Sequence, residues 1–255
     1  MRTEPGHNVR VWLALVGVLL FQANIHVCQE PPPTQVSRAP VARDTDAHRK
    51  AREVMVRQQI VARGVRDQWV LQALRAVPRH LFVPPEMQPF ACLDSPLPIG
   101  HEQTISQPYI VGFMTEALKL KSEDRVLEVG TGSGYQAAVL SVLVREVYSI
   151  EIIEPLAAEA ANRLRKLGYA NVYVRAGDGY RGWPAAAPFD AIVVTTAPDH
   201  IPQPLLDQLA LGGRLIIPVG RNFQTLTRIS RTATGFKTER LLPVRFVPMT
   251  GEAEK

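Results

Sequence analysis

Apolar residues recur at helical spacing near the start of the patterned region, over residues 47–63 and again over residues 67–76. Asp67 is suited to cap the second of these helices. A third helix is expected over residues 106–118, because the hydroxyl of Ser106 can cap its first turn and a proline follows closely. The segment before it is rich in proline and indicates a loop. The pattern therefore predicts a layer of helices ahead of the rest of the chain.

Beyond these helices the pattern changes to short β-branched runs that alternate with helical segments. Strands are expected at residues 125–129, 147–150, 172–175, 191–195 and 214–218, and helices at 135–143, 155–167 and 202–211. Two more strands, at 224–230 and 236–246, follow them. This alternation is typical of parallel βαβ units. The sequence thus predicts an α/β fold with a doubly wound, mostly parallel, Rossmann-like sheet, N-terminal helices and a C-terminal antiparallel addition.

An apolar run over residues 11–21 follows two arginines, as in the charged and hydrophobic parts of a signal peptide. The run is too short to span a bilayer comfortably, and no clean cleavage site follows it. We expect a signal-like or anchor-like extension over residues 1–30, a proline-rich linker over residues 31–47 and a folded domain over residues 48–255. A misassigned start is the alternative, since Met55 opens a segment that is already strongly patterned.

Composition narrows the classes of function. The chain has 255 residues, 46% of them hydrophobic and 21% charged, which suits one globular domain with an appendage. The net charge of +5 is mild and the basic residues are spread out, so nucleic-acid binding is not expected. Two cysteines, Cys28 and Cys92, cannot by themselves build a disulfide scaffold or a four-ligand zinc site, and we expect no metal.

The strongest local motif is a strand that runs directly into a glycine-rich turn and a helix, over residues 126–134. Its glycines, Gly130, Gly132 and Gly134, let the backbone turn tightly and approach a ligand. Their G-x-G-x-G spacing, with Glu128 just before the turn, differs from the dinucleotide fingerprint and favours a nucleoside ligand without a pyrophosphate. The alternative is a tight turn that binds nothing.

Two acidic residues at the ends of the next strands fit the same ligand. Glu151 lies where a carboxylate can accept hydrogen bonds from both hydroxyls of a ribose. Asp178, followed by Gly179, could accept a hydrogen bond from the amine of an adenine. Their local alternatives are an exposed strand-end acid and an Asx turn. Because the glycine turn and both acids share one carboxyl edge, a class I S-adenosylmethionine-dependent methyltransferase is the leading interpretation and a nicotinamide enzyme the second.

Other segments carry a resemblance to a known family. They are Val-Pro-Arg-His-Leu-Phe-Val-Pro at 77–84, Leu-Pro-Ile-Gly at 97–100, Gln-Thr-Ile-Ser-Gln-Pro-Tyr at 103–109, Asp-Ala-Ile-Val-Val-Thr at 190–195 and Gly-Gly-Arg-Leu-Ile-Ile-Pro-Val-Gly at 212–220. With them the chain resembles the protein-L-isoaspartate O-methyltransferases from about Met55 to Gly251. Generic methyltransferases lack the Thr-Ile-Ser-Gln-Pro segment, so the resemblance is specific. The chain departs from the family at Glu102, where glycine is more usual, and in the extension before Met55.

The resemblance implies methyl transfer from S-adenosylmethionine to the free α-carboxylate of an isoaspartyl residue, or to the side-chain carboxylate of D-aspartate, in damaged proteins. The ester then collapses to a succinimide, whose hydrolysis returns some normal aspartate. Damaged proteins are the implied partners, no stable partner is implied, and most relatives are monomers. The resemblance makes Ser106 the active residue, which orients the substrate by hydrogen bonding, and it places at the cofactor and substrate Gln103, Thr104, Ile105 and Thr250.

The methyl transfer requires no acid or base of unusual strength among the side chains. A carboxylate is ionised near pH 7 and a sulfonium is an activated donor, so no strong base is required and positioning must supply most of the acceleration. His80 and His101 have no evident acidic partner in the sequence and are expected to be loop or core histidines.

Two other functions stay open. One is methylation of a small molecule or nucleic acid, although the chain has neither an N-P-P-Y-type motif nor a basic stripe. The other is a non-catalytic module, anchored at the cell envelope, that keeps the cofactor fold. Because the cofactor is made in the cytoplasm, we expect a cytoplasmic protein; export or inner-membrane anchoring through residues 11–21 is the alternative.

Overall fold

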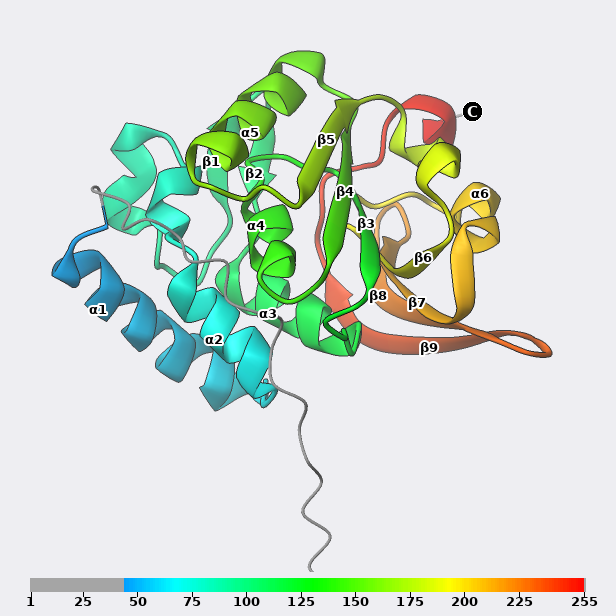
Figure 1. Cartoon of the computed structure of the whole chain (residues 1–255), viewed down its shortest axis with the longest axis horizontal. Helices are drawn as coiled ribbons and strands as arrows, with labels where there is room; N and C mark the ends of the chain where they lie inside the picture. The colour runs from blue at the N-terminus through cyan, green and yellow to red at the C-terminus, as the bar shows by residue number, and fades with distance from the viewer. Residues whose placement is uncertain (1–43, 255) are drawn as a thin grey trace, which may run out of the picture. The chain divides into compact units, whose positions relative to one another are not determined.

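A computed structural model describes residues 44–254, and its centre is a seven-stranded sheet in the order β5-β4-β3-β6-β7-β8-β9. The strands are β3 (Arg125–Val129), β4 (Glu146–Glu151), β5 (Val172–Ala176), β6 (Phe189–Val194), β7 (Leu209–Val219), β8 (Gln224–Thr232) and β9 (Gly235–Val244). The strands from β5 to β7 run parallel, and β8 and β9 are antiparallel additions at one edge (Figure 1). The predicted doubly wound sheet with its C-terminal antiparallel addition is confirmed.

The strand order changes direction at β3. Strands β4 and β5 follow on one side of it, whereas β6 and β7 lie on the other. The carboxyl ends of β3 and β6 therefore flank the kind of crevice in which open α/β sheets bind ligands. Strand β3 enters helix α4 (Tyr135–Ser141) through the glycine-rich turn.

Alternate residues of the central strands pack on opposite faces of the sheet. On β6, Ala191 and Val193 belong to one buried cluster, and Ile192 and Val194 belong to the other. Two further helices are α5 (Glu154–Lys166) and α6 (Gln203–Asp207). The first cluster joins the sheet to α4, to α5 and to the helices of the N-terminal layer, and the second joins it to α6 and the C-terminal segment. Burial on both faces explains why these strands are almost continuously apolar.

The N-terminal layer begins with α1 (Asp46–Met55), which continues through a π turn (Val56–Ile60) and a 3-10 turn (Val61–Arg63), and is followed by α2 (Gln68–Ala76) and α3 (Pro108–Ala117). Thr45 caps α1, and Asp67 caps α2 as predicted, accepting hydrogen bonds from the backbone N–H groups of Trp69 and Val70. Short 3-10 turns occur at Arg79–Phe82, Pro85–Phe90, Gly179–Arg181, Pro184–Ala186 and Gly251–Glu254.

The predicted helix over residues 202–211 is too long. Helix α6 ends at Asp207, and β7 begins at Leu209. Leu209 pairs with Phe189 of β6, and a bulge follows this pair. Strand pairing, which the local pattern does not encode, thus replaces the last turn of the predicted helix.

The segment before α3 contains an antiparallel hairpin, β1 (Leu97–Gly100) and β2 (Gln103–Ile105), where the sequence predicts a loop. Within residues 44–254 the hairpin pairs only with itself, as a separate two-stranded sheet. Ser106 follows β2 but does not cap α3, because Gln107 is the N-cap residue and no side chain makes a capping hydrogen bond there. The predicted cap at Ser106 is therefore wrong.

No helix between residues 44 and 254 combines the length and hydrophobicity needed to cross a bilayer. The apolar run over residues 11–21, the extension over residues 1–30 and most of the predicted linker lie outside the described residues. Helix α1 begins at Asp46, near the end of that linker.

Candidate functional site

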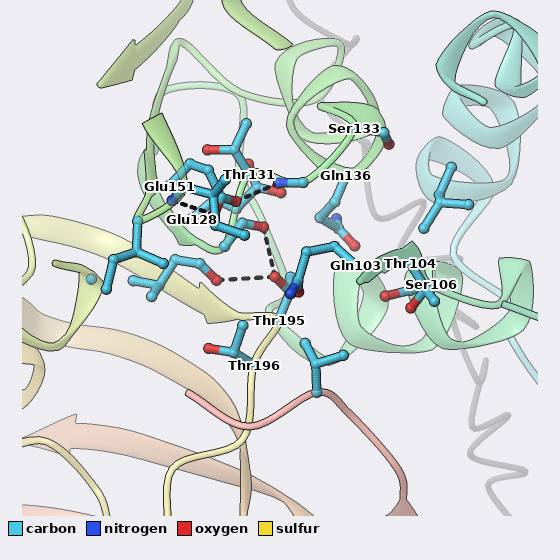
Figure 2. A pocket seen from close by; sticks show the side chains of 18 of the residues that line it. Gln103, Thr104, Ser106, Glu128, Thr131, Ser133, Gln136, Glu151, Thr195 and Thr196 are labelled. Atoms are coloured by element: carbon cyan, nitrogen blue, oxygen red, sulfur yellow. Dashed lines mark hydrogen bonds between the residues drawn. The ribbon is translucent and has the colours of Figure 1, made fainter. Parts of the chain in front are cut away.

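A cavity of about 330 Å³ lies at the carboxyl edge of the sheet, beside the ends of β3 and β6. A cavity of this size suits a small-molecule ligand. Most of the predicted site residues line it: Gln103, Thr104, Ile105, Ser106, Glu128, Gly130, Gly132, Glu151, Gly179 and Thr250 (Figure 2). Gly134 and Asp178 belong to the same turns but are not among the lining residues.

The glycine-rich turn packs closely against the end of β6. Gly130, Gly132 and Gly134 have φ values of 93°, 52° and 86°, in the left-handed region that side chains rarely adopt. A Cβ at Gly130 would lie 2.4 Å from the Oγ1 of Thr195, whose hydroxyl hydrogen-bonds to the carbonyls of Val129 and Gly130. The turn therefore needs glycine for its conformation and, at Gly130, also for the close approach of β6.

Glu151 ends β4 with its carboxylate beside the glycine turn. Its Oε2 accepts a hydrogen bond from the backbone N–H of Gly132 at 2.8 Å, and its Oε1 accepts one from the N–H of Ile153 at 3.1 Å. The residue is nearly buried and lines the cavity. Two backbone donors thus orient the carboxylate, and each oxygen keeps a lone pair for a ligand hydroxyl.

Glu128 lies fully buried beneath the same turn (Figure 2). Its Oε2 accepts a hydrogen bond from Ser149, whose hydroxyl is 2.6 Å from that of Thr131. Its Oε1 has no hydrogen-bond partner among residues 44–254. Burial raises the pKa of Glu128 to about 8, although the bond from Ser149 opposes this rise and the Glu151 carboxylate adds to it. Near neutral pH the group is mainly protonated, and one oxygen can still pair with a polar ligand atom.

Asp178 follows β5, and both of its oxygens are bonded to backbone. Oδ1 accepts a hydrogen bond from the N–H of Tyr180, and Oδ2 accepts one from the N–H of Glu252, each at 2.9 Å. The first bond forms the Asx turn that is the local alternative for this residue. The neighbouring Gly179 does line the cavity, and a Cβ there would lie 2.4 Å from a methyl group of Val129. The contact of Asp178 with an adenine stays a prediction.

The opposite wall of the cavity consists of strand β2 and the residue that follows it. Its residues are Gln103, Thr104, Ile105 and Ser106. Figure 2 shows Thr104 and Ser106 across the cavity from Glu151. The cavity thus has a nucleoside-type edge on the sheet and a wall bearing hydroxyl groups that belongs to another part of the chain.

The C-terminal segment closes a third side. The backbone N–H of Ala197 donates to the carbonyl of Val247 at 2.8 Å, and the N–H of Met249 donates to the carbonyl of Ala197 at 3.0 Å. This bridge to the end of β6 holds Thr250 beside the cavity, where the resemblance puts a contact.

The turn of the β1–β2 hairpin is strained at the mouth of the cavity. His101 and Glu102 have φ values of 51° and 57°, in the left-handed region, although neither is glycine. Both are exposed and line the cavity. This conformation explains why glycine suits position 102, where the chain departs from the resemblance, and it makes His101 a loop residue, as predicted.

Several polar residues of the cavity were not among the predicted site residues. Thr131, Gln136, Thr195 and Thr196 line it, and Ser149 lies behind the turn. Thr195 and Thr196 follow a predicted strand at the same edge as the acidic residues, which was a usable signal. Ser149 lies inside a strand, where nothing in the sequence distinguishes it from a core position.

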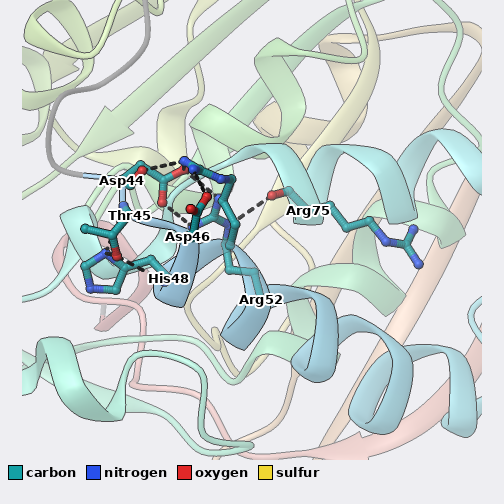
Figure 3. A network of polar contacts seen from close by, with 7 residues as sticks. Asp44, Thr45, Asp46, His48, Arg52 and Arg75 are labelled. Atoms are coloured by element: carbon teal, nitrogen blue, oxygen red, sulfur yellow. Dashed lines mark hydrogen bonds and ion pairs between the residues drawn. The ribbon is translucent and has the colours of Figure 1, made fainter.

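His80 is a buried residue with partners that the sequence does not reveal. Its ring stacks on that of His48 with 3.7 Å between centroids, and Asp44 completes a group whose possible metal-ligand atoms lie within 4.8 Å of one another. However, Arg52 donates to both oxygens of Asp44, at 2.7 and 2.8 Å (Figure 3). The guanidinium would repel a metal cation. The geometry favours an ion-pair network here, and the absence of a metal stays a prediction.

Comparison with known proteins gives a family for this arrangement. The family model described as protein-L-isoaspartate(D-aspartate) O-methyltransferase matches residues 50–254. A protein-L-isoaspartate O-methyltransferase of Picosynechococcus sp. is 54% identical over 202 residues, which cover 79% of this chain and 91% of the relative. One of Opitutus terrae is 49% identical over 246 residues, which cover 96% and 99%. This second match is longer than the described part of the chain and so reaches into the N-terminal extension.

Two solved structures that are similar to this one are described as members of the same family as the sequence relatives. A structure described as a protein-L-isoaspartate O-methyltransferase has a TM-score of 0.72 at 29% identity and covers 81% of this chain, and 67% of its own chain is matched. A Plasmodium falciparum structure described as a "putative protein-L-isoaspartate O-methyltransferase beta-aspartate methyltransferase", in complex with S-adenosyl-L-homocysteine, has a TM-score of 0.68 at 25% identity. The match covers 80% of this chain and 98% of that one. The resemblance stated from the sequence motifs is confirmed, and the chain belongs to the protein-L-isoaspartate(D-aspartate) O-methyltransferase family.

Proposed function

We propose that this protein methylates the free carboxylate of L-isoaspartyl and D-aspartyl residues in damaged proteins, with S-adenosylmethionine as the methyl donor. Collapse of the ester to a succinimide then begins repair. The observation that carries the proposal is one cavity in which a nucleoside-type edge faces the Thr-Ile-Ser segment across a single space. Membership of the family supports the same reaction.

The residues present fit the donor. The glycine turn leaves its backbone open to a ligand, Glu151 offers an oriented carboxylate for ribose hydroxyls, and Glu128 has a buried oxygen still to be paired. We assign donor binding to these residues together with strand β2 from Gln103 to Ile105, the Asp178–Gly179 turn and Thr250. When bound, the donor supplies a methyl group on a positively charged sulfur.

The chain has only to position the acceptor. A carboxylate is ionised at neutral pH and needs no base to become a nucleophile. One of its oxygens forms the new bond to the methyl carbon while the bond from that carbon to sulfur breaks, so the products are a methyl ester and a thioether. The protein contributes alignment of the two groups and exclusion of water. We assign to the Ser106 hydroxyl a hydrogen bond to the acceptor carboxylate, which orients it without covalent participation.

The direct test is transfer of labelled methyl to two matched peptides, one isoaspartyl and one normal. Labelling of the isoaspartyl peptide alone is expected. If S-adenosylhomocysteine binds but neither peptide is labelled, the substrate assignment fails and a small-molecule acceptor becomes the leading candidate.

The Ser106→Ala variant tests the assigned role of this hydroxyl. Loss of a hydrogen bond to a charged group should lower kcat/KM for the isoaspartyl peptide by about 10- to 100-fold. Affinity for S-adenosylhomocysteine should be nearly unchanged, because the glycine turn is untouched. Ser122→Ala is the matched control, since Ser122 lies before β3 and bonds only its neighbour Glu123 among the described residues. Equal rates in both variants would remove Ser106 from the site.

We infer a cytoplasmic protein, because its donor is made in the cytoplasm, and a monomer, because the resemblance implies one. In this proposal residues 1–30 are an extension and residues 31–47 a linker ahead of the methyltransferase domain, and nucleic acid is not a partner. Cell fractionation tests the location: recovery of the mature chain outside the inner membrane would contradict it and favour export.

A further inference from the structure

Arg79 is a charged side chain with no exposure to solvent. It lies in the 3-10 turn after α2 and is 0% exposed. Within the described part of the chain its guanidinium contacts carbonyl oxygens and an aromatic face and forms no ion pair with a carboxylate. Burial of such a charge is costly, and it lowers the pKa of Arg79. Because burial of this charge destabilises the fold, we look for a role of Arg79 that a smaller apolar residue could not perform.

The two ends of the guanidinium bind two different loops. Its Nε donates to the carbonyl of Ala91 at 2.8 Å, and its Nη2 donates to the carbonyl of Ser106 at 2.8 Å. Its carbon lies 4.7 Å from the centre of the Tyr135 ring, which lines the cavity. Arg79 thus connects the loop after the Pro85–Phe90 turn with the wall of the cavity that bears Ser106.

The backbone at Ser106 has few other restraints. Strand β2 ends at Ile105, so Ser106 lies beyond the hairpin ladder. Helix α3 begins at Pro108, and no side chain caps it. Besides Arg79, two contacts are described in this gap, and both involve Gln107: its carbonyl accepts the first helical bond from the N–H of Val111 at 3.2 Å, and its side-chain amide donates to the carbonyl of Asp94 at 3.1 Å near the surface. Arg79 is therefore the buried restraint on the peptide unit that follows Ser106.

We propose that Arg79 is a positioning residue for the reaction, which fixes the peptide group of Ser106 and thereby aims the Ser106 hydroxyl at the acceptor carboxylate. The inference rests on the proposed role of Ser106. A planar guanidinium holds two carbonyls in a set geometry, whereas a lysine ammonium does not provide the same fork of donors. A small displacement of an orienting group is enough to lower the rate strongly.

The test compares Arg79→Lys with Arg52→Lys in the full-length protein. Arg52 is the matched control, because it is also a buried arginine of the N-terminal layer, with bonds to the carbonyl of Arg75 and to Asp44, and it does not touch the cavity. We expect Arg79→Lys to lower kcat for the isoaspartyl peptide by at least about tenfold and to change the dissociation constant of S-adenosylhomocysteine by less than about threefold. Arg52→Lys should lower the thermal midpoint but leave kcat within about threefold of the parent.

Amide hydrogen exchange supplies a readout that does not need the reaction. Exchange over residues 103–109 should become faster in Arg79→Lys and stay unchanged in Arg52→Lys. If the lysine variant does not fold, Arg79→Gln removes the buried charge, keeps one amide donor and should show the same changes.

The outcomes separate the two proposals. A parent protein that binds S-adenosylhomocysteine but labels no isoaspartyl peptide would overturn the proposed function, and with it the positioning role of Arg79. If the parent is active, equal kcat values in the Arg79 and Arg52 variants, or unchanged exchange over residues 103–109, would overturn the positioning role alone.

Discussion

At the scale of single residues, the hydrogen bonding of the buried Glu128 carboxyl group depends on which ligand occupies the cavity. One of its oxygens is bonded to Ser149, and the other has no partner in the described structure although it is buried. A buried polar atom without a hydrogen bond destabilises the fold that contains it. A ligand that forms a hydrogen bond with this oxygen would therefore raise the free energy of unfolding as well as fill the site.

The raised pKa of Glu128 predicts a pH-dependent stability. The folded protein holds this proton up to about pH 8, whereas the unfolded chain releases it above about pH 4.5. The contribution of Glu128 to the free energy of unfolding is thus complete below pH 4.5 and is lost as the pH rises through the folded pKa. Denaturant unfolding of the parent and of Glu128→Gln should show a difference that declines from pH 5 to 8 with a slope no steeper than about 1.4 kcal/mol per pH unit. A constant difference would contradict the raised pKa.

The strained turn at the cavity mouth predicts a stabilising substitution. Glu102→Gly should raise the free energy of unfolding by about 0.5 to 1 kcal/mol, because relief of the left-handed strain outweighs the added freedom of the unfolded chain. Lys119→Gly is the matched control, since Lys119 also has a positive φ, 49°, but lies outside the cavity. Denaturant titration of both variants gives the comparison, and destabilisation of both would show that these backbones are not strained.

At the scale of elements, the connection from β3 to α4 is where conformation and packing coincide. The turn is left-handed at each of its three glycines, and its first glycine touches the end of β6. This connection therefore links two strands of the sheet as well as a strand and a helix.

Comparison of Gly130→Ala with Gly168→Ala separates the effect of the left-handed conformation from the effect of close packing. Gly168 follows α5 with a φ of 81° and has open space around it, whereas Gly130 has a φ of 93° and a hydroxyl within 2.4 Å of the new methyl group. We expect Gly168→Ala to cost about 1 kcal/mol of stability and Gly130→Ala about 3 kcal/mol, with at least about tenfold weaker binding of S-adenosylhomocysteine in the latter alone. Calorimetric titration and thermal unfolding provide both quantities. Equal losses of stability would mean that Thr195 moves aside without cost.

Elements with a strong local sequence pattern were predicted, whereas features decided by contacts between distant residues were missed. Buried parallel strands and the glycine turn have strong local patterns, and all of them were predicted. The β1–β2 hairpin was missed because its turn, His101–Glu102, uses residues that rarely adopt left-handed conformations. The prediction of the last helical turn before β7 was wrong, because Leu209 pairs with Phe189 of β6 instead of continuing the helix. Ser149 and Arg79, which lie behind the residues that line the cavity, were not predicted for the same reason, since their partners are far away in the sequence.

At the scale of the whole molecule, the first described residues are tied to the N-terminal layer of helices. Thr45 caps α1, and Asp44 pairs with Arg52, a side chain that is only 3% exposed. The first described residues thus neutralise a charge that is buried in the N-terminal layer.

Asp44→Asn should therefore destabilise the full-length protein. Removal of the partly exposed Asp44 carboxylate leaves the buried guanidinium of Arg52 without its counter-charge, and we expect a loss of about 2 to 3 kcal/mol in the free energy of unfolding. Asp46→Asn is the control, because the side chain of Asp46 is 97% exposed and should contribute little. Thermal and denaturant unfolding measure the two effects. Equal stabilities would show that Arg52 finds another partner.

The separate β1–β2 hairpin has a consequence for how such enzymes can diverge. Most of the proposed donor site is built from the carboxyl ends of the sheet, whereas Ser106, the residue assigned to the acceptor, directly follows a hairpin that shares no ladder with that sheet within the described structure. Substitutions at Ser106 and its neighbours can accumulate without disturbing the strands of that sheet. Descendants of one ancestor could thus inherit the same donor half and exchange one acceptor for another by rewriting a short stretch of chain.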